Sequence, residues 1–183
     1  MKCKISFPIL VIICIAFVAA AVFAVSQSES IQLRTFGIST LNGLESVKPL
    51  VTFAFRNYAG RPRKHALLNE DMIRTEVDER LKRADIAIEE EPTEDSGILV
   101  INVVGINAQK DQSLYIFTIQ VEFIQNVKLV RDEEIFTSAR TWPNWTNTKL
   151  ITVGPSQLKT AVIQAINQEL STFIKDFKAA NSR

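Results

Sequence analysis

The stretch YIFTIQVEF, Tyr115–Phe123, decides the fold class. Its apolar side chains recur at positions 115, 117, 119, 121 and 123, and Thr118, Gln120 and Glu122 lie between them. Successive side chains of a β-strand point to opposite faces, so this alternation predicts a strand with one face toward a core and one toward solvent. A sheet built from such a strand needs a second layer to cover its apolar face.

Two amphipathic helices are predicted as that second layer. Asn69 is a candidate N-cap, and Glu70–Ala84 carries apolar residues at helical spacing behind an acidic first turn. Gly154 and Pro155 mark the start of a C-terminal helix of about 23 residues, with Pro at its first position. Its apolar stripe consists of Leu158, Val162, Ala165, Ile166, Leu170, Phe173, Ile174 and Phe177.

The remaining strands are read from β-branched and aromatic runs. They are 47–55, the short run 86–91, 98–108 and 135–142, with one further edge strand around 31–36. A strand from 115 to 130 would exceed the usual length, so we expect a bend or bulge near Gln125–Asn126. We therefore predict an α+β fold: an antiparallel sheet of four to five strands with two helices packed on one face, preceded by an N-terminal hydrophobic helix.

The N-terminus predicts export. Lys2 and Lys4 precede an apolar run from Ile5 to Val25, and a polar stretch follows. This is the layout of a signal peptide, with cleavage expected after Ala24 or Ser26. The run is also long enough to span a bilayer, so an uncleaved anchor is the alternative. Both place the body in the periplasm, free or anchored to the inner membrane.

The expected domain organisation follows from the leader. Residues 1–26 form the signal peptide or anchor, 27–46 a linker, and 47–180 a single α+β domain. Cys14 lies in the middle of the apolar run, which excludes a lipoprotein signal. If the leader is uncleaved, residues 5–25 hold the protein in the membrane.

The charge and cysteine content exclude several classes of protein. The chain has 21 Lys and Arg against 20 Asp and Glu, and loss of Lys2 and Lys4 with the leader leaves 19 against 20, a formal charge of −1. A nucleic-acid binder would normally show a basic excess. Both cysteines, Cys3 and Cys14, lie in the leader, so the body has no disulfide, thiol nucleophile or cysteine metal site.

Few residues suggest catalysis. The one histidine, His65, lies among basic residues with no orienting acid nearby in sequence. The acidic run 89–95 is typical of a solvated turn, and no glycine-rich phosphate loop occurs. The basic loop with Arg56, Arg61, Arg63 and Lys64 could meet an anionic partner. We predict no catalytic residue, cofactor or metal ligand, and hence a non-enzymatic protein.

The stretch RTWPNWTNT, residues 140–148, holds both tryptophans. Trp142 continues the period of the preceding strand and is expected to cap the core edge. Trp145 follows Pro143 in a polar loop, and exposed aromatic residues on loops often anchor partners. The candidate contact residues are therefore Arg140, Trp142, Asn144 and Trp145.

Three segments resemble a family of uncharacterised small exported bacterial proteins: LNEDMIRTEVDERLKRADIAI (68–88), LYIFTIQVEFIQNVKLVRDEE (114–134) and ARTWP (139–143). The family has an RTEV-type helix, a VxLVR strand end and a Thr-Trp pair. The matching positions are Arg74, Thr75, Glu76, Val77, Arg80, Leu81, Val127, Leu129, Val130, Arg131, Thr141 and Trp142.

The resemblance covers about residues 70–180 and implies export but no known activity or ligand. The family's glycine-rich stretch after the tryptophan is PNWTNTKLITVG in this chain. At the level of fold, the arrangement is similar to the N-terminal domain of the Tol-Pal periplasmic protein and to lipopolysaccharide-assembly lipoproteins, which fixes no function.

Three functions are consistent with these features. The first is an exported, non-enzymatic envelope protein that acts by binding or assembly, with an envelope protein or lipid as partner. The second is a carrier of a small apolar or lipid ligand, in a cavity bordered by Phe117, Ile119, Phe173 and Phe177. The third is a hydrolase that uses carboxylates gathered in a cleft.

Overall fold

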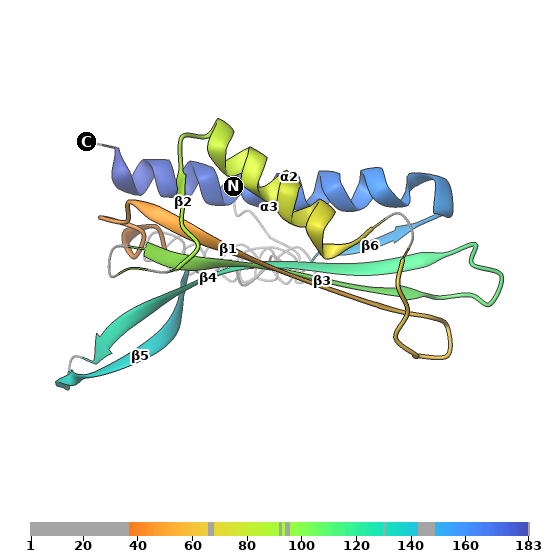
Figure 1. Ribbon diagram of the computed structural model, residues 1–183, viewed down its shortest axis with the longest axis horizontal. Helices are drawn as coiled ribbons and strands as arrows, with labels where there is room; N and C mark the ends of the chain where they lie inside the picture. Colours follow the sequence, from red (N-terminus) through yellow and green to blue (C-terminus); the bar gives the residue numbers. More distant parts are fainter. Residues whose placement is uncertain are drawn as a thin grey trace, which may run out of the picture. The chain divides into compact units, whose positions relative to one another are not determined.

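The computed structural model describes residues 37–65, 68–91, 93, 96–129, 131–142 and 149–182. Residues Gly37–Arg183 form one compact α+β unit (Figure 1). Its elements are β1 (Ser46–Arg56), α2 (Glu70–Arg83), β2 (Ala87–Ile88), β3 (Ser96–Asn107), β4 (Tyr115–Leu129), β5 (Asp132–Trp142), β6 (Lys149–Val153), a 3-10 turn (Pro155–Gln157) and α3 (Leu158–Asn181). The predicted N-terminal hydrophobic helix and the edge strand at 31–36 lie outside the described residues.

The predicted α+β class is confirmed, but the sheet formed by the described residues is mixed and has six strands, so the predicted antiparallel sheet of four to five strands is wrong. The order is β2-β1-β3-β4-β5, and β6 also pairs with β4. β1 is parallel to both β2 and β3, and the other pairs are antiparallel. The reason is α2, which carries the chain back along β1 so that β3 starts at the same end as β1. Parallel neighbours need such a crossover, usually a helix.

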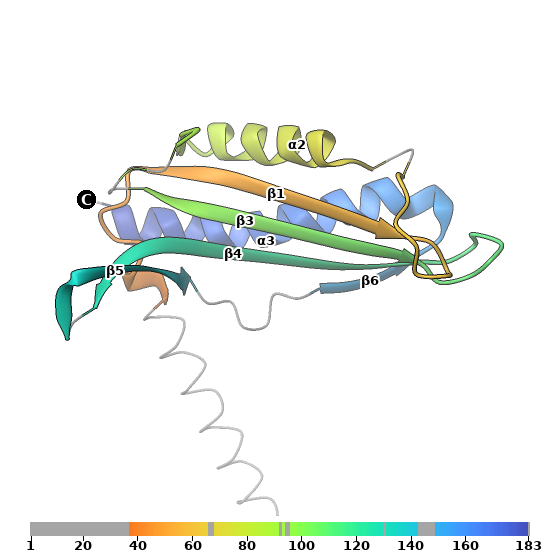
Figure 2. The same cartoon turned by 60° about the horizontal axis from the view of Figure 1, so that its bottom comes forward.

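β5 and β6 share one edge of β4 (Figure 2). β6 pairs with Tyr115–Ile119, and β5 pairs with Phe123–Leu129. β4 is continuous over 15 residues. Its register with β5 shifts between Phe123 and Ile124 and again between Lys128 and Leu129, on either side of the bulge predicted near Gln125–Asn126. Such irregularities let a long edge pairing twist and end.

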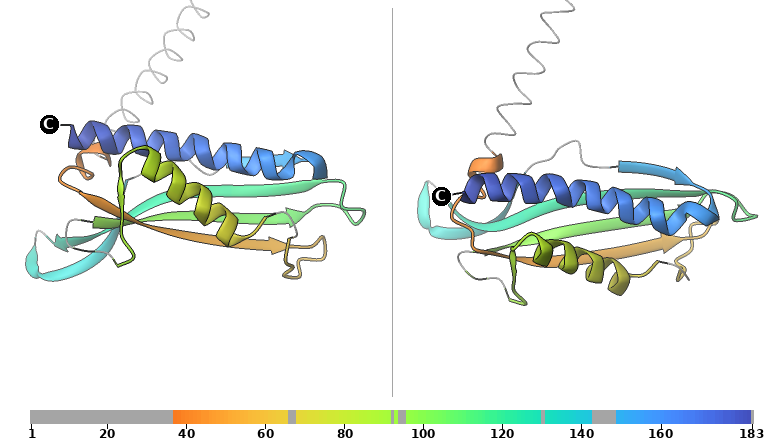
Figure 3. Two further views of the ribbon diagram at one scale, coloured as in Figure 1. Left: turned by 45° about the horizontal axis from the view of Figure 1, so that its top comes forward. Right: turned by 90° about the horizontal axis from the view of Figure 1, so that it is seen from above.

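α2 begins where the sequence predicts, whereas α3 begins three residues after the predicted start at Pro155. The Asn69 side chain accepts a hydrogen bond from the Met72 N–H at 2.8 Å, which caps α2. A 3-10 turn from Pro155 leads into α3. Both helices pack on the same face of the sheet, as predicted (Figures 1 and 3).

The core lies between the helices and the sheet. The five alternating positions of β4 from 115 to 123 are buried, together with Leu99, Ile101 and Val103 of β3. Seven of the eight predicted stripe residues of α3 are buried, and Ile174 is half-buried. The predicted layer contact is therefore confirmed.

The compact unit begins before β1, within the segment expected as a linker. Leu41 and Leu44 are buried in the core. Asn181, at the end of α3, donates from Nδ2 to the Leu41 carbonyl at 2.9 Å and accepts from the Gly43 N–H at 2.8 Å. The chain therefore enters the unit beside the C-terminal end of α3.

Candidate functional site

The outer surface of the helical layer carries a valley between α2 and α3. Two hydrogen bonds bridge it: Asn167 Nδ2 donates to Glu76 Oε1 at 2.9 Å, and Arg80 Nη2 donates to Ser171 Oγ at 2.7 Å. In both pairs the α3 residue comes 91 residues after its α2 partner. Because this offset is the same at both bridges, the two helices run in the same direction. The bridges divide the valley into two grooves of different charge.

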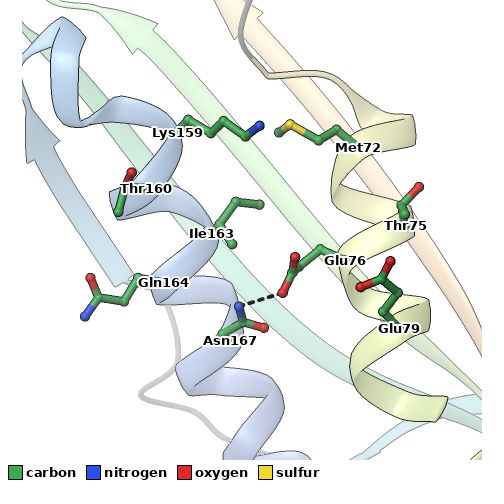
Figure 4. Close-up of a pocket in the computed structure, with 9 residues that line it drawn as sticks. All are labelled: Met72, Thr75, Glu76, Glu79, Lys159, Thr160, Ile163, Gln164 and Asn167. Atoms are coloured by element: carbon green, nitrogen blue, oxygen red, sulfur yellow. Dashed lines mark hydrogen bonds between the residues drawn. The ribbon is translucent and has the colours of Figure 1, made fainter. Parts of the chain in front are cut away.

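The first groove lies between the N-terminal halves of the helices and has a volume of about 690 Å³. We call it the polar groove; its lining residues are Met72, Thr75, Glu76, Glu79, Lys159, Thr160, Ile163, Gln164 and Asn167 (Figure 4). Met72 and Ile163 supply apolar surface between the charged groups. The Asn167 Oδ1 atom is buried and accepts no hydrogen bond from the described residues. An unpaired buried carbonyl is costly, so a hydrogen-bond donor that reached this atom would be favoured.

The second groove lies between the C-terminal end of α2 and the later turns of α3, with a volume of about 390 Å³. We call it the basic groove; it is lined by Arg80, Arg83, Ala84, Ser171, Ile174, Lys175 and Lys178. Among these described residues four are cationic and none is acidic. Glu79, one turn before Arg83 on α2, pairs with it, Oε2 to Nη2, at 3.1 Å.

Of the four candidate contact residues around the tryptophans, the structure describes Trp142 and Arg140. Trp142 is buried, its ring meets Phe173 edge-on with centroids 5.3 Å apart, and its Nε1 donates to Asp176 Oδ2 at 3.3 Å. This is the core-edge position that the strand period predicts. Arg140 is exposed and pairs with Glu122 across the sheet, Nη2 to Oε1, at 2.8 Å. Asn144 and Trp145 lie outside the described residues.

His65 packs against aromatic rings at the far end of the sheet. Its ring lies edge-on to Phe55 at 4.9 Å and to Tyr115 at 5.6 Å. Burial, and then the nearby Arg63 guanidinium, lower the pKa of His65 below its usual value. The imidazole is therefore neutral at pH 7 and serves as part of the packing.

A third groove, of about 420 Å³, lies beside the loop that follows β1. Its basic lining residues are Arg56, Arg63 and Lys64. The Arg56 Nη1 atom donates to the Gly60 carbonyl at 3.0 Å, which ties it to its own loop. This loop follows the end of β1, whereas the C-terminal end of α2 leads to β2 at the start of β1. The loop groove and the basic groove therefore lie at opposite ends of the unit.

The four residues expected around a ligand cavity pack against each other and their neighbours. Phe117, Ile119 and Phe173 are fully buried, and Phe177 is nearly so. The rings of Phe173 and Phe177 lie 5.7 Å apart. None of the three grooves described above is lined by any of these four residues.

The acidic side chains of the described residues are mostly dispersed or paired. Among those residues no group of three or more His, Cys, Asp or Glu side chains is placed to hold a metal ion. Glu169 is buried and pairs with Lys149 Nζ at 2.8 Å. Glu91, in the predicted acidic run, is exposed and pairs with Lys48 at 3.4 Å.

Comparisons with family models, curated proteins and solved structures found no match to this chain. Neither helix within the described ranges is long and apolar enough to cross a membrane, and the predicted signal or anchor at 1–26 lies outside those ranges. Neither groove of the valley was predicted from the sequence. The only signal was the polar residues on the outer faces of the two helices, which a solvated surface explains equally well.

Proposed function

We propose that this chain is an exported, non-enzymatic envelope protein that acts by binding another envelope protein through the polar groove. The supporting observation is the buried Asn167 carbonyl oxygen beside an open groove of about 690 Å³. A partner that enters the groove and donates a hydrogen bond there would remove the cost of leaving this oxygen unpaired.

The open shape of the groove favours a protein partner over a small ligand. Small-molecule sites are mainly apolar and enclose most of the ligand. The lining surface of the polar groove is itself mainly apolar, but the groove is open and would enclose little of a small ligand, and the charged Glu76, Glu79 and Lys159 lie along it. Mixed polar and apolar lining of this kind is typical of contact surfaces between proteins.

Export is tested by protease treatment of spheroplasts. If the body faces the periplasm, added protease digests it while a cytoplasmic marker protein stays intact. N-terminal sequencing of the native protein then separates a cleaved leader from an anchor. Protection of the body until the cells are lysed would refute export.

The groove is tested by photo-crosslinking in living cells. A benzophenone side chain at Gln164, which is exposed and lines the polar groove, is expected to give one discrete protein adduct. The matched position is Lys110, exposed in the turn between β3 and β4. Thr160→Trp, one helical turn from Gln164, fills the groove and should abolish the adduct. Equal adducts from Gln164 and Lys110, or an adduct insensitive to Thr160→Trp, would refute the proposed site.

A further inference from the structure

The basic groove gathers like charges that have few partners. Arg80 is held by its hydrogen bond to Ser171, and Arg83 by its pair with Glu79. Lys175 and Lys178 have no ion-pair partner among the described residues. The four cations that line the groove, together with the Glu79 carboxylate that pairs with Arg83, have a formal charge of +3, and the groove itself has a volume of about 390 Å³. Cations held this close repel one another unless an anion lies between them.

The helix dipoles explain only part of this cluster. Cations are favoured in the last turn of a helix, and the effect fades beyond that turn. It accounts for Arg80 and Arg83 at the end of α2 and for Lys178 at the end of α3. Lys175 lies six residues before Asn181, the last residue of α3, so the dipole gives no reason for a cation there. Lys175 is exposed beside the groove, where an anionic ligand would meet it.

The wall of the groove indicates an anion attached to an apolar body. Ile174 and Ala84 line it beside the four cations, and Ile174 is only half-buried. A free inorganic anion gains nothing from this surface. An anionic phospholipid gains from both parts, its phosphate from the cations and its glycerol and upper acyl carbons from the apolar wall.

The groove also lies at the end of the unit where the chain enters. Asn181, which binds the backbone of Leu41 and Gly43, is three residues beyond Lys178. Between the predicted apolar run, which ends at Val25, and Gly37 there are 11 residues, which span at most about 40 Å. An anchored leader would thus keep this end of the unit within reach of the bilayer.

We propose that the basic groove binds the phosphate of an anionic phospholipid in the periplasmic leaflet of the inner membrane. This inference rests on the proposed export. Bound in this way, the valley would meet the membrane at its basic end and leave the polar groove at its other end open to a partner.

The test uses the full chain in dodecyl maltoside and the short-chain lipid dihexanoyl-phosphatidylglycerol, with binding followed by calorimetry. Each removed cation should weaken binding about fivefold, so Lys175→Ala with Lys178→Ala should weaken it about 25-fold. The double change to Arg keeps both charges and should keep binding. The matched control, Arg63→Ala with Lys64→Ala, removes the same charge from the opposite end and should change binding less than about twofold.

Four results would overturn the proposal: no binding of the lipid, equal loss in both alanine pairs, equally tight binding of dihexanoyl-phosphatidylcholine, or displacement of the lipid by an equal concentration of inorganic phosphate. The last result would assign the groove to free phosphate. Thermal melting of each variant checks that the fold is kept. Because binding in detergent is measured whether or not the cell exports the chain, failure of this inference is distinct from failure of the proposed export.

Discussion

The substitution Gly105→Ala tests how closely the sheet packs beneath the helices. Gly105 lies in β3 directly opposite Phe117 of β4. A Cβ atom at position 105 would lie 2.2 Å from Phe117 Cε1 and 2.6 Å from Cδ1. Carbon atoms in contact are about 3.5–4.0 Å apart, so the ring would have to move by more than about 1 Å. Phe117 is fully buried and stacks on Phe55 at 6.1 Å, which leaves it little room.

The expected cost follows from two opposing terms. Overpacking a close-packed core costs about 1–3 kcal/mol. Replacing Gly by Ala also restricts the unfolded chain, which stabilises the folded state by about 0.4–1 kcal/mol. The net loss for Gly105→Ala is therefore about 1.5 kcal/mol. In a protein of this size that corresponds to a melting temperature about 3–6 °C lower.

Urea unfolding of a double-mutant cycle with Phe117→Val provides the assay. Valine has no atom beyond Cγ, so all three ring atoms that the new Cβ would meet are removed. In the Phe117→Val background, Gly105→Ala should cost less than about 0.5 kcal/mol, which leaves a coupling energy of about 1 kcal/mol. A Gly105→Ala variant as stable as the parent, or one equally destabilised in both backgrounds, would refute the packing argument.

Three further outcomes are expected. Phe173→Ala, which removes a fully buried ring in contact with three other aromatic rings, should lower the free energy of unfolding by about 3–5 kcal/mol in urea titrations. Lys149→Met leaves the buried Glu169 carboxylate without its ion-pair partner and should lower the free energy of unfolding by about 1–2 kcal/mol. This is less than for a fully buried ion pair, because Lys149 is partly exposed; adding Glu169→Leu should restore most of the lost stability. Because folding lowers the pKa of His65, the unfolded chain binds a proton at this side chain at a higher pH than the folded chain does. The contribution of His65 to the free energy of unfolding is therefore constant above about pH 6.5 and is lost as the pH falls from that value through the lower pKa of the folded state. The free energy of unfolding should fall less between pH 7.5 and pH 5 in His65→Gln than in the parent protein. An equal fall in both proteins would contradict the assigned burial of His65.

Local periodicity predicted the elements whose burial is one-sided. The alternation in Tyr115–Phe123 and the stripe of α3 are each set by which face meets the core, so the pattern is legible in the sequence. The cap at Asn69 depends on its own side chain and a backbone N–H three residues away. Such features need no knowledge of the rest of the chain.

Features set by distant partners were not predicted. The parallel pairing of β1 with β3 depends on α2 crossing back over the sheet, and neither strand carries a sign of its neighbour's direction. β6 was missed because it has only five residues, Ile151 and Val153 are only half-buried, and the exposed Leu150 on the opposite face obscures the alternation. Trp142 was placed in the core by strand period, whereas the partner of Arg140, Glu122 on β4, could be found only from the register of two strands.

The charge of the valley follows from the direction of its two helices. Each helix alone shows an ordinary polar face, and the acids Glu70 and Asp71 open α2 while Arg80 and Arg83 end it. If α3 ran antiparallel to α2, these acids would lie beside the lysines near the end of α3, and the charges would pair. The fixed offset of 91 residues between bridged positions shows instead that α3 runs parallel, so the basic ends of both helices meet. The crossover that makes β1 and β3 parallel sets the direction of α2. The strands β3, β4 and β5 alternate in direction, and β6 is antiparallel to β4, as β5 is, so the chain leaves β6 at the end of the sheet from which α3 runs back. The concentration of cations at one end of the valley is therefore a consequence of the topology, and reading either helix by itself could not have revealed it.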